Sequence, residues 1–383
     1  MIYLDNAATT FPKPDCVYDK VNTVQRTIAV NVGRGSYSAA ADAMRVVDET
    51  RQLLASFVGA AGSESVVFTP SATIAANEII LGLEWDSLKN VYVTPFEHNA
   101  IARPLFGKCQ EHGIDIQIIP FDPQTHEIDM EELGRLFAIN PPDYVFLNQV
   151  SNVTGTIVPI EKIAKASKEY GAVVVVDGSQ SIGLIPVEIS KTDIDYLIFA
   201  GHKNLYASWG IGGFVCNSSY KLKPMLSGGT GSDSLNLSMP DSAPYGFEFA
   251  SPNIIAIASL NASLKWLEQE SLEAISHHKN KLMQRLIEKL KDCDVQLYLP
   301  ADLTNHTSVL SFNIPEYEAN EVGVILNEDF DIAVRTGYHC APYIHQFLKT
   351  IECKGTVRVS LGYFNTEDDV DALVNAVKDI VRG

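Results

Sequence analysis

The sequence predicts an α/β protein in which a mainly parallel, seven-stranded sheet lies between helices and a smaller C-terminal α/β domain follows. Two observations support this fold class. From about residue 64 to residue 216, short apolar runs rich in valine and isoleucine alternate with amphipathic segments. Such runs, flanked by helices, are typical of parallel strands buried on both faces. After Pro252 the pattern changes to a long helical region and further strands.

Seven apolar runs supply the strands of the large sheet. They are SVVFTP (65–70), NVYVTP (90–95), IDIQIIPF (114–121), YVFLNQV (144–150), AVVVVDG (172–178), DYLIFAG (195–201) and GGFVC (212–216). Helical patterns lie between them at 73–83, 100–112 and 160–170. Ligands of such sheets bind at the carboxyl ends of the strands, so the functional residues are expected there.

The C-terminal part reads as a smaller domain. Residues 254–291 are mostly helical, the strand-like pieces VQLYL (295–299), TSVLSFNI (307–314) and TVRVSL (356–361) follow, and a final helix spans 366–381. We expect an N-terminal segment, 1–20, that packs with this small domain. The large domain is expected over 21–253 and the small one over 254–383.

Composition excludes several classes of protein. The net charge of −18 over 383 residues argues against binding to nucleic acid, and it leaves room for a basic protein partner. No apolar stretch approaches the ~20 residues that span a bilayer, and the acidic, polar N-terminus is unlike a signal peptide, so a cytoplasmic enzyme is expected. The six cysteines form no CxxC pair, which predicts neither a metal site nor a disulfide framework.

The stretch VRTGYHCAP (334–342) carries the most unusual cysteine. Gly337 and Pro342 place Cys340 on a loop that follows a strand-like run, Ile332 to Val334. Beside Arg335 and His339, its thiol could be an accessible, partly ionised nucleophile. A half-buried cysteine without a chemical role is the alternative, and this stretch alone favours it.

Two strand ends carry residues suited to a cationic ring and an aldehyde. Asp177 ends the run VVVVD, with Gln180 three residues on, and could hold a protonated ring nitrogen or simply cap a turn. His202 and Lys203 follow LIFAG. Burial would lower the pKa of the lysine and suit it as a Schiff-base amine, whereas a solvated loop lysine is the plainer interpretation.

Three further turns complete the set. In FTPSAT, the residues Ser71, Ala72 and Thr73 open a helix and offer backbone N–H groups and a hydroxyl to a phosphate, although Ser and Thr are also ordinary helix caps. His98 and Asn152 lie at two more strand-to-helix turns, and no GxGxxG follows a strand. A phosphate cradle, a ring-stacking histidine, a carboxylate and a lysine are the parts of a pyridoxal phosphate site.

Six motifs in this order make the sequence recognisable: YLDNAATT, FEHNA, SNVTGT, VVVDGSQS, AGHK and RTGYHCA. The chain resembles, over nearly its whole length, the class V aminotransferase-fold cysteine desulfurases, which have fold type I of the pyridoxal phosphate enzymes. RTGYHCAP is most similar to the SufS-type (group II) branch, which includes selenocysteine lyases.

The resemblance implies a role for each residue of the cofactor site. Lys203 would carry pyridoxal phosphate covalently, Asp177 would keep its ring nitrogen protonated, and His98 would stack on the ring and assist proton transfers. Gln180 and Asn152 would bond the phenolic oxygen. The phosphate would be bound by the Ser71-Ala72-Thr73 turn, by His202 and, from the other subunit of a homodimer, by Ser251 of FEFASPN.

The resemblance also implies the substrate site. Arg358 would grip the carboxylate of L-cysteine with both branches of its guanidinium, aided by Asn152 and by Arg34, for which a surface arginine is the alternative. Cys340 would take the substrate sulfur as a persulfide, release L-alanine, and pass the sulfur to an acceptor protein by moving on its glycine-containing loop. His339 could tune the thiol or merely hydrogen-bond within the loop.

The sequence departs from the family pattern at three places, where Ala200 replaces a serine, Tyr338 replaces a histidine, and the phosphate turn has one hydroxyl fewer. These changes remove no group that the chemistry requires, but they leave the branch and the preferred substrate open. Selenocysteine lyase activity is one alternative. An aminotransferase or β-lyase that does not use Cys340 is another, and a sulfur-transfer partner without catalysis is a third.

Overall fold

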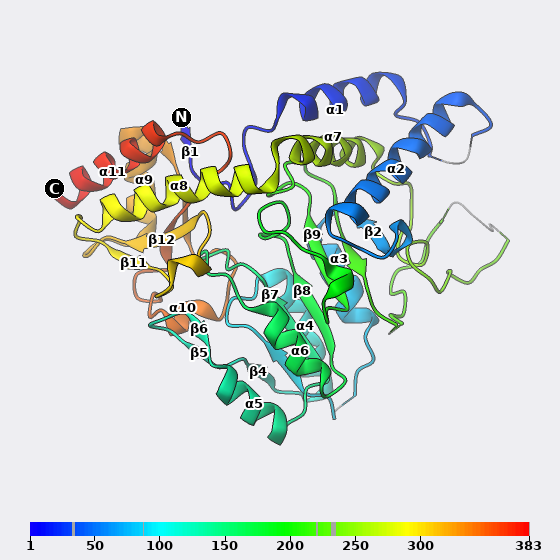
Figure 1. The fold of residues 1–383 in the computed structure, drawn as a ribbon, viewed down its shortest axis with the longest axis horizontal. Coiled ribbons are helices and arrows are strands. Elements are labelled where there is room, and N and C mark those ends of the chain that lie inside the picture. The colour runs from blue at the N-terminus through cyan, green and yellow to red at the C-terminus, as the bar shows by residue number, and fades with distance from the viewer. Residues whose placement is uncertain (33–34, 87, 220, 231–234, 383) are drawn as a thin grey trace.

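The computed structural model describes residues 1–383 except 33–34, 87, 220, 231–234 and 383. Among the described residues, the largest sheet has seven strands in the order β2-β10-β9-β8-β7-β3-β4 (Figure 1). The strands are β2 (Val66–Thr69), β3 (Val91–Val93), β4 (Ile116–Ile118), β7 (Tyr144–Asn148), β8 (Val173–Asp177), β9 (Tyr196–Ala200) and β10 (Gly212–Cys216). Each lies within one of the seven predicted runs, so the predicted fold class is confirmed.

The sheet is parallel apart from one strand. β4, β3, β7, β8 and β9 pair in parallel, whereas β10 is antiparallel to both β9 and β2. The carboxyl ends of β2, β3, β7, β8 and β9 therefore point to the same edge of the sheet. Segments that follow these strands meet at that edge, although they are far apart in the sequence.

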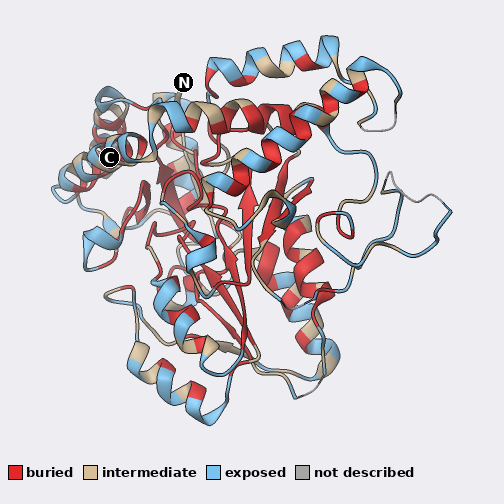
Figure 2. Cartoon of the chain, turned by 45° about the vertical axis from the view of Figure 1, so that its right-hand side comes forward, coloured by how far each residue is buried: buried red, intermediate tan, exposed pale blue. Residues whose placement is uncertain are grey.

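Helices cover the sheet and leave its strands buried (Figure 2). The helices that accompany the large sheet are α1 (Asp15–Thr27), α2 (Ser38–Phe57), α3 (Ala72–Gly82), α4 (Asn99–His112), α5 (Met130–Ile139), α6 (Ile160–Lys168) and α7 (Ile254–Glu270). Their inward faces and the two faces of the sheet form two clusters of buried apolar residues. A small two-stranded sheet, β5 (Phe121–Asp122) and β6 (Glu127–Ile128), connects β4 to α5.

The C-terminal residues build a second, antiparallel sheet with its own core. Its order is β11-β12-β15-β14, from β11 (Gln296–Tyr298), β12 (Val309–Asn313), β14 (Arg335–Gly337) and β15 (Thr356–Ser360). The helices of this part are α8 (Leu272–Leu290), α9 (Ala319–Phe330), α10 (Ile344–Phe347) and α11 (Glu367–Arg382). β1 (Ile2–Tyr3) pairs in parallel with β13 (Ile332–Ala333), which brings the N-terminus to this sheet.

Two features differ from the sequence expectations. The predicted helical region 254–291 is two helices, because Ser271 takes a left-handed backbone conformation with φ of 63° and its side chain then caps α8. The stretch Arg335–Gly337 was expected as a loop after the strand-like run, but it is strand β14 and pairs with β15. The apolar signal ends at Val334, so the pairing of these three residues depends on β15 and not on their own pattern. No helix among the described residues is long and apolar enough to cross a bilayer.

Lys279 of α8 is a buried lysine between two cores. It is 2% exposed, its Nζ donates to Asn204 Oδ1 at 2.8 Å, and burial lowers its pKa to about 7. Ile275 and Leu282, one turn on either side, belong to different apolar clusters. The amine therefore links the end of the large sheet to the C-terminal part through one hydrogen bond.

The titration of Lys279 should make stability depend on pH. Its pKa is about 7 in the folded protein and near 10.5 when unfolded, so between these values the unfolded chain binds more protons. The free energy of unfolding should therefore rise with pH over this window, by at most about 1.4 kcal/mol per pH unit from this group. In Lys279→Met this part of the slope should disappear, as measured by urea unfolding at about pH 7 and about pH 10. An unchanged slope, or an equal loss in the exposed Lys281→Met control, would contradict this assignment.

Candidate functional site

A pocket of about 230 Å³, here termed the inner pocket, lies at the carboxyl ends of the parallel strands. It is lined by residues that follow five different strands, as the sequence predicts for such a sheet. Of the predicted site residues, the structure brings ten together here: Ser71, Ala72, Thr73, His98, Asn152, Asp177, Gln180, His202, Lys203 and Arg358. Cys340 lines a neighbouring cavity, Ser251 lines a third, and Arg34 lies outside the described residues.

Lys203 follows β9 and places its amine inside the inner pocket. Burial, opposed by the negative charge of Asp177 and aided by the nearby Arg358 and Arg335, lowers its pKa to about 8. Far more of the amine is therefore unprotonated near neutral pH than in a solvated lysine. Only an unprotonated amine can attack a carbonyl carbon, so the surroundings prepare Lys203 for covalent attachment of an aldehyde.

His98 begins α4 and serves as its N-terminal cap. The Ala100 N–H donates to His98 Nδ1 at 3.0 Å, so the proton of the neutral ring lies on Nε2. Burial, aided by the nearby Lys203, lowers the pKa of His98 to about 4. The site thus contains a neutral imidazole with one free N–H, which suits stacking on a ring better than a charged imidazolium would.

Another group of residues in the wall of the inner pocket can hold an anion. Ser71 caps α3 by accepting from Ile74 N at 3.3 Å, and the first turn of the helix offers N–H groups and the Thr73 hydroxyl. His202 stacks on Trp209 with ring centroids 4.0 Å apart, and its buried Nδ1 has no hydrogen-bond partner among the described residues. This unsatisfied atom and the helix N-terminus are what a phosphate group requires.

Asp177 also lines the inner pocket. It is 7% exposed, and its Oδ1 accepts a hydrogen bond from Ser179 N at 2.9 Å. Gln180 Nε2 donates to Ala7 O at 2.8 Å. An anion cradle, a buried carboxylate, a neutral histidine and an amine of lowered pKa together match the phosphate, ring nitrogen, ring face and aldehyde of pyridoxal phosphate. The residues present therefore fit that cofactor.

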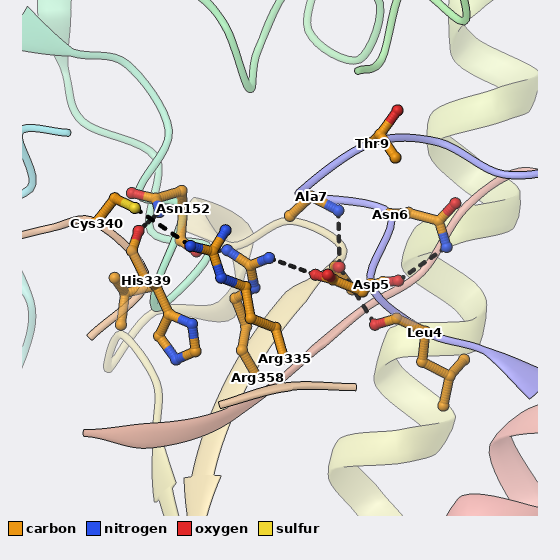
Figure 3. Close-up of polar contacts among 12 residues, drawn as sticks. Leu4, Asp5, Asn6, Ala7, Thr9, Asn152, Arg335, His339, Cys340 and Arg358 are labelled. Carbon is orange, nitrogen blue, oxygen red and sulfur yellow. Dashed lines mark hydrogen bonds and ion pairs between the residues drawn. The ribbon is translucent and has the colours of Figure 1, made fainter. Parts of the chain in front are cut away.

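Arg358 of β15 is fully buried and already partnered (Figure 3). Its Nη2 forms an ion pair with Asp5 Oδ1, its Nη1 donates to Asn152 O at 3.0 Å, and its Nε has no partner among the described residues. The predicted two-pronged grip on a carboxylate is thus not available without a rearrangement. Nε is left without a partner but is buried, so an incoming anion can reach the guanidinium only if the surrounding residues, Asp5 included, move.

Cys340 sits on a short loop next to Asn152 and His339 (Figure 3), and two hydrogen bonds hold this loop to the segments that follow β3 and β7. The Asn99 N–H donates to Cys340 O at 2.7 Å, and Asn152 Nδ2 donates to His339 O at 2.7 Å. Both His339 and Cys340 have left-handed backbone conformations, with φ of 48° and 58°. This conformation is rare for residues other than glycine. The hydrogen bonds hold the loop in it and aim the thiol.

His339 is a hydrogen-bonding group of the loop. Its Nε2 lies 3.0 Å from Thr356 O, and a carbonyl only accepts, so Nε2 carries the proton. Burial lowers the pKa of His339 well below its ordinary value. The ring is therefore neutral, and of the two alternatives for His339 the geometry favours the structural one.

Arg335 was expected near the Cys340 thiol, but its place in the wall of the inner pocket was not predicted. Its Nη2 donates to Cys340 Sγ at 3.2 Å, and the residue lines both the inner pocket and the cavity that contains the thiol. The arginine stands in the same short motif as the cysteine, but only a strand at 335–337 directs its side chain toward the sulfur. Residues 335–337 show no alternation of apolar and polar side chains, so the sequence alone does not predict which way the Arg335 side chain points.

Comparisons with known proteins agree with this geometry. The family model "Aminotransferase class-V" matches residues 2–373. A probable cysteine desulfurase from Pyrococcus abyssi is 31% identical over 392 residues, which cover 100% of this chain and 94% of that protein. A cysteine desulfurase from Yersinia pestis is 31% identical over 391 residues, with 100% and 94% covered.

Solved structures give the same result. An apo cysteine desulfurase from Thermococcus onnurineus superimposes with a TM-score of 0.92 at 30% identity, covering 100% of this chain and 95% of the other. The Escherichia coli cysteine desulfurase CsdA, in an S-sulfonic acid form, gives a TM-score of 0.86 at 27% identity, with 100% and 94% covered. Enzymes of this family depend on pyridoxal phosphate. The pocket, the full-length similarity and the family model agree, and this chain belongs to the class-V aminotransferase family.

Proposed function

We propose that this protein is a pyridoxal phosphate-dependent cysteine desulfurase, which converts L-cysteine to L-alanine and leaves the sulfur as a persulfide on Cys340. The observation that carries the proposal is the position of Cys340. Its thiol is held by Arg335 next to a pocket that contains Lys203, Asp177 and His98. A lyase or aminotransferase would need the last three residues but not an oriented thiol.

The cofactor supplies the electron-withdrawing ring, and the residues around it would hold the ring and its phosphate. Bound pyridoxal phosphate withdraws electrons from the α-carbon of the substrate. Asp177 would hold a proton on the ring nitrogen, and His98 would pack on the ring. The α3 N-terminus, Thr73 and His202 would bind the phosphate, and Gln180 and Asn152 would bond the ring oxygen. The family resemblance implies these roles, and the presence of all these residues in the wall of the inner pocket supports them.

Lys203 performs the proton transfers at the substrate. Its amine would hold the cofactor covalently, and, when not so engaged, its Nζ would be the group that removes the α-proton. A pKa of about 8 lets the amine accept this proton and give it up again near neutral pH. Arg358 binds the substrate carboxylate through its unpartnered Nε. Arg34 is a second candidate for this carboxylate.

Cys340 performs the transfer of sulfur. Its Sγ attacks the sulfur of the substrate, the carbon–sulfur bond breaks, and the electron pair of that bond remains on the carbon, which takes a proton to become alanine. The transferred sulfur stays on Cys340 as a persulfide, so no external oxidant or reductant is needed. The guanidinium of Arg335 stays within hydrogen-bonding distance of the attacking sulfur.

The products distinguish this proposal from its nearest alternative. With L-cysteine and a thiol reductant, the desulfurase should release alanine and sulfide in equal amounts, whereas a β-lyase would release pyruvate and ammonia. Pyruvate as the main product of the wild type would overturn the proposal.

In Arg358→Lys the KM for L-cysteine should rise by about tenfold or more, because a lysine cannot reproduce the guanidinium contacts.

Finer assignments belong to the same proposal. We propose the SufS-type branch for the chain on its RTGYHCAP motif. We also propose domains at 21–253 and 254–383, with residues 1–20 packed against the smaller one; α7, the first helix of the smaller domain, then packs against the core of the large sheet. We propose a cytoplasmic homodimer in which Ser251 reaches the cofactor phosphate of the other subunit, and a protein as the final sulfur acceptor. L-selenocysteine is a second substrate for the same assay, since selenium leaves carbon more readily and need not require Cys340.

A further inference from the structure

One edge of the Arg358 guanidinium is already half occupied by a carboxylate of the chain itself. Arg358 lines the inner pocket and is fully buried. A carboxylate is held most firmly when it accepts from two N–H groups on one edge of a guanidinium, such as Nε and Nη2. Here Nη2 is paired with Asp5 and Nη1 donates to Asn152 O, which leaves Nε without a partner among the described residues (Figure 3).

The negative charge of Asp5 meets a need of the buried guanidinium. A buried cation is stable only when an anion lies close to it. The ion pair with Asp5 is the one that the described residues give to Arg358, and the nearby Arg335 adds a second positive charge. A substrate carboxylate brings the same charge to the same edge. Two carboxylates on one edge repel each other, so the second can bind fully only when the first leaves.

The side chain of Asp5 can leave Arg358 while its backbone stays in place. Ser360 holds the backbone on both sides of Asp5, because Ser360 N donates to Leu4 O at 2.7 Å and Ala7 N donates to Ser360 Oγ at 2.8 Å. The side chain of Asp5 is nevertheless 21% exposed. A rotation of this side chain therefore brings its carboxylate into water without unfolding the segment that carries it.

We propose that Asp5 sets the affinity of the substrate site for carboxylates: in the free protein it takes the place of the substrate carboxylate on Arg358, and the substrate must displace it. This inference rests on the proposed function and adds what controls binding at the same site. The exchange keeps one anion on the guanidinium at every stage. It weakens substrate binding, and it favours release of L-alanine, because Asp5 returns to the vacated edge.

The test measures binding to the cofactor-loaded protein without turnover. The probes are propionate, which has the carboxylate of L-cysteine but neither its amine nor its sulfur, and propionamide, the neutral molecule of the same shape. The melting temperature Tm is recorded as each probe is added, and the dissociation constant is obtained from its rise. Propionate should bind Asp5→Asn about tenfold more tightly than the wild type, because no carboxylate has to be displaced. Propionamide should bind both proteins equally weakly.

Stability and affinity should change in opposite directions in this variant. Without a probe, Asp5→Asn should melt about 5 °C or more below the wild type, because Arg358 has lost its anion. Propionate supplies that anion and should close most of the gap. A residue with a purely structural role would lose stability and gain no affinity, so the two readouts together identify an exchange at Arg358.

Asp331→Asn is the matched control. Asp331 pairs with the N-terminal amine of Met1, so this change removes a carboxylate that holds the same N-terminal segment but takes none from Arg358. Its affinity for propionate should equal that of the wild type. Asp5→Glu keeps the negative charge and should bind propionate no more tightly than the wild type does.

Contrary outcomes separate this inference from the proposed function. Equal affinity of propionate for Asp5→Asn and the wild type, or an equal gain in Asp331→Asn, would overturn the role of Asp5 and leave the desulfurase proposal standing. If Asp5→Asn is unfolded in buffer, propionate should restore its cooperative melting and propionamide should not, and a failure of propionate to do so counts against the inference. If the wild type forms no alanine from L-cysteine, the proposed function fails on a readout that the propionate titration does not use.

Discussion

The Lys203→Ala protein is expected to fold but to lose turnover of L-cysteine by roughly 10⁴-fold or more, because one group both attaches the cofactor and moves the α-proton. Lys203→Arg should be equally inactive, since a guanidinium keeps the charge but cannot form the covalent link. The measurement is alanine release together with borohydride reduction, which fixes cofactor to the wild-type chain.

The two readouts make this prediction specific. After reduction, mass spectrometry should find the cofactor on the peptide that contains Lys203 in the wild type and on no peptide of either variant. Circular dichroism and the urea midpoint check that the variants are folded. Cofactor on another lysine, or activity in Lys203→Ala within tenfold of the wild type, would remove Lys203 from the mechanism.

Replacing Cys340 by alanine should lower alanine release from L-cysteine by roughly 10³-fold or more, as the loss of a nucleophile does in other enzymes. The inner pocket should be intact, because Cys340 lines the neighbouring cavity and its contact to Asn99 uses the backbone carbonyl. Cofactor absorbance should therefore be retained. This combination of a loaded cofactor and lost turnover separates a role in sulfur transfer from a role in folding.

Cys353→Ala is the matched control, since Cys353 is also a free, partly buried cysteine of the C-terminal part. It lines none of the three cavities and should leave turnover unchanged. Full turnover of L-cysteine by Cys340→Ala would contradict the account and favour a lyase. Turnover of L-selenocysteine alone by that variant would instead indicate that selenium leaves without help from the thiol.

The large sheet was predictable because its strands are buried on both faces. In the sequence such strands appear as continuous apolar runs. The polar residue at or just after the end of a run, such as Asp177 or Lys203, lies at the edge of the sheet where ligands bind. Parallel pairing then brings these residues together whatever their separation in the sequence. The inner pocket could therefore be assembled from local patterns and one topological rule.

The contacts that complete the site depend on long-range pairing, which no local pattern reports. Arg358 forms an ion pair with Asp5, 353 residues away, because β1 and β15 are brought into one region of the fold. Arg335 faces Cys340 only because Arg335–Gly337 pairs with β15. A mobile glycine loop was expected around Cys340, yet Asn99, which begins α4, and Asn152, which follows β7, bond its carbonyls.

A persulfide on Cys340 would be visible in the mass of the protein itself. Cofactor-loaded wild type is mixed with less than one equivalent of L-cysteine without reductant, and the intact protein and its Cys340 peptide are weighed. We expect one added sulfur atom on Cys340, an equal amount of alanine, and removal of the sulfur by dithiothreitol. Alanine released without added sulfur on Cys340, or sulfur found on another cysteine, would contradict it.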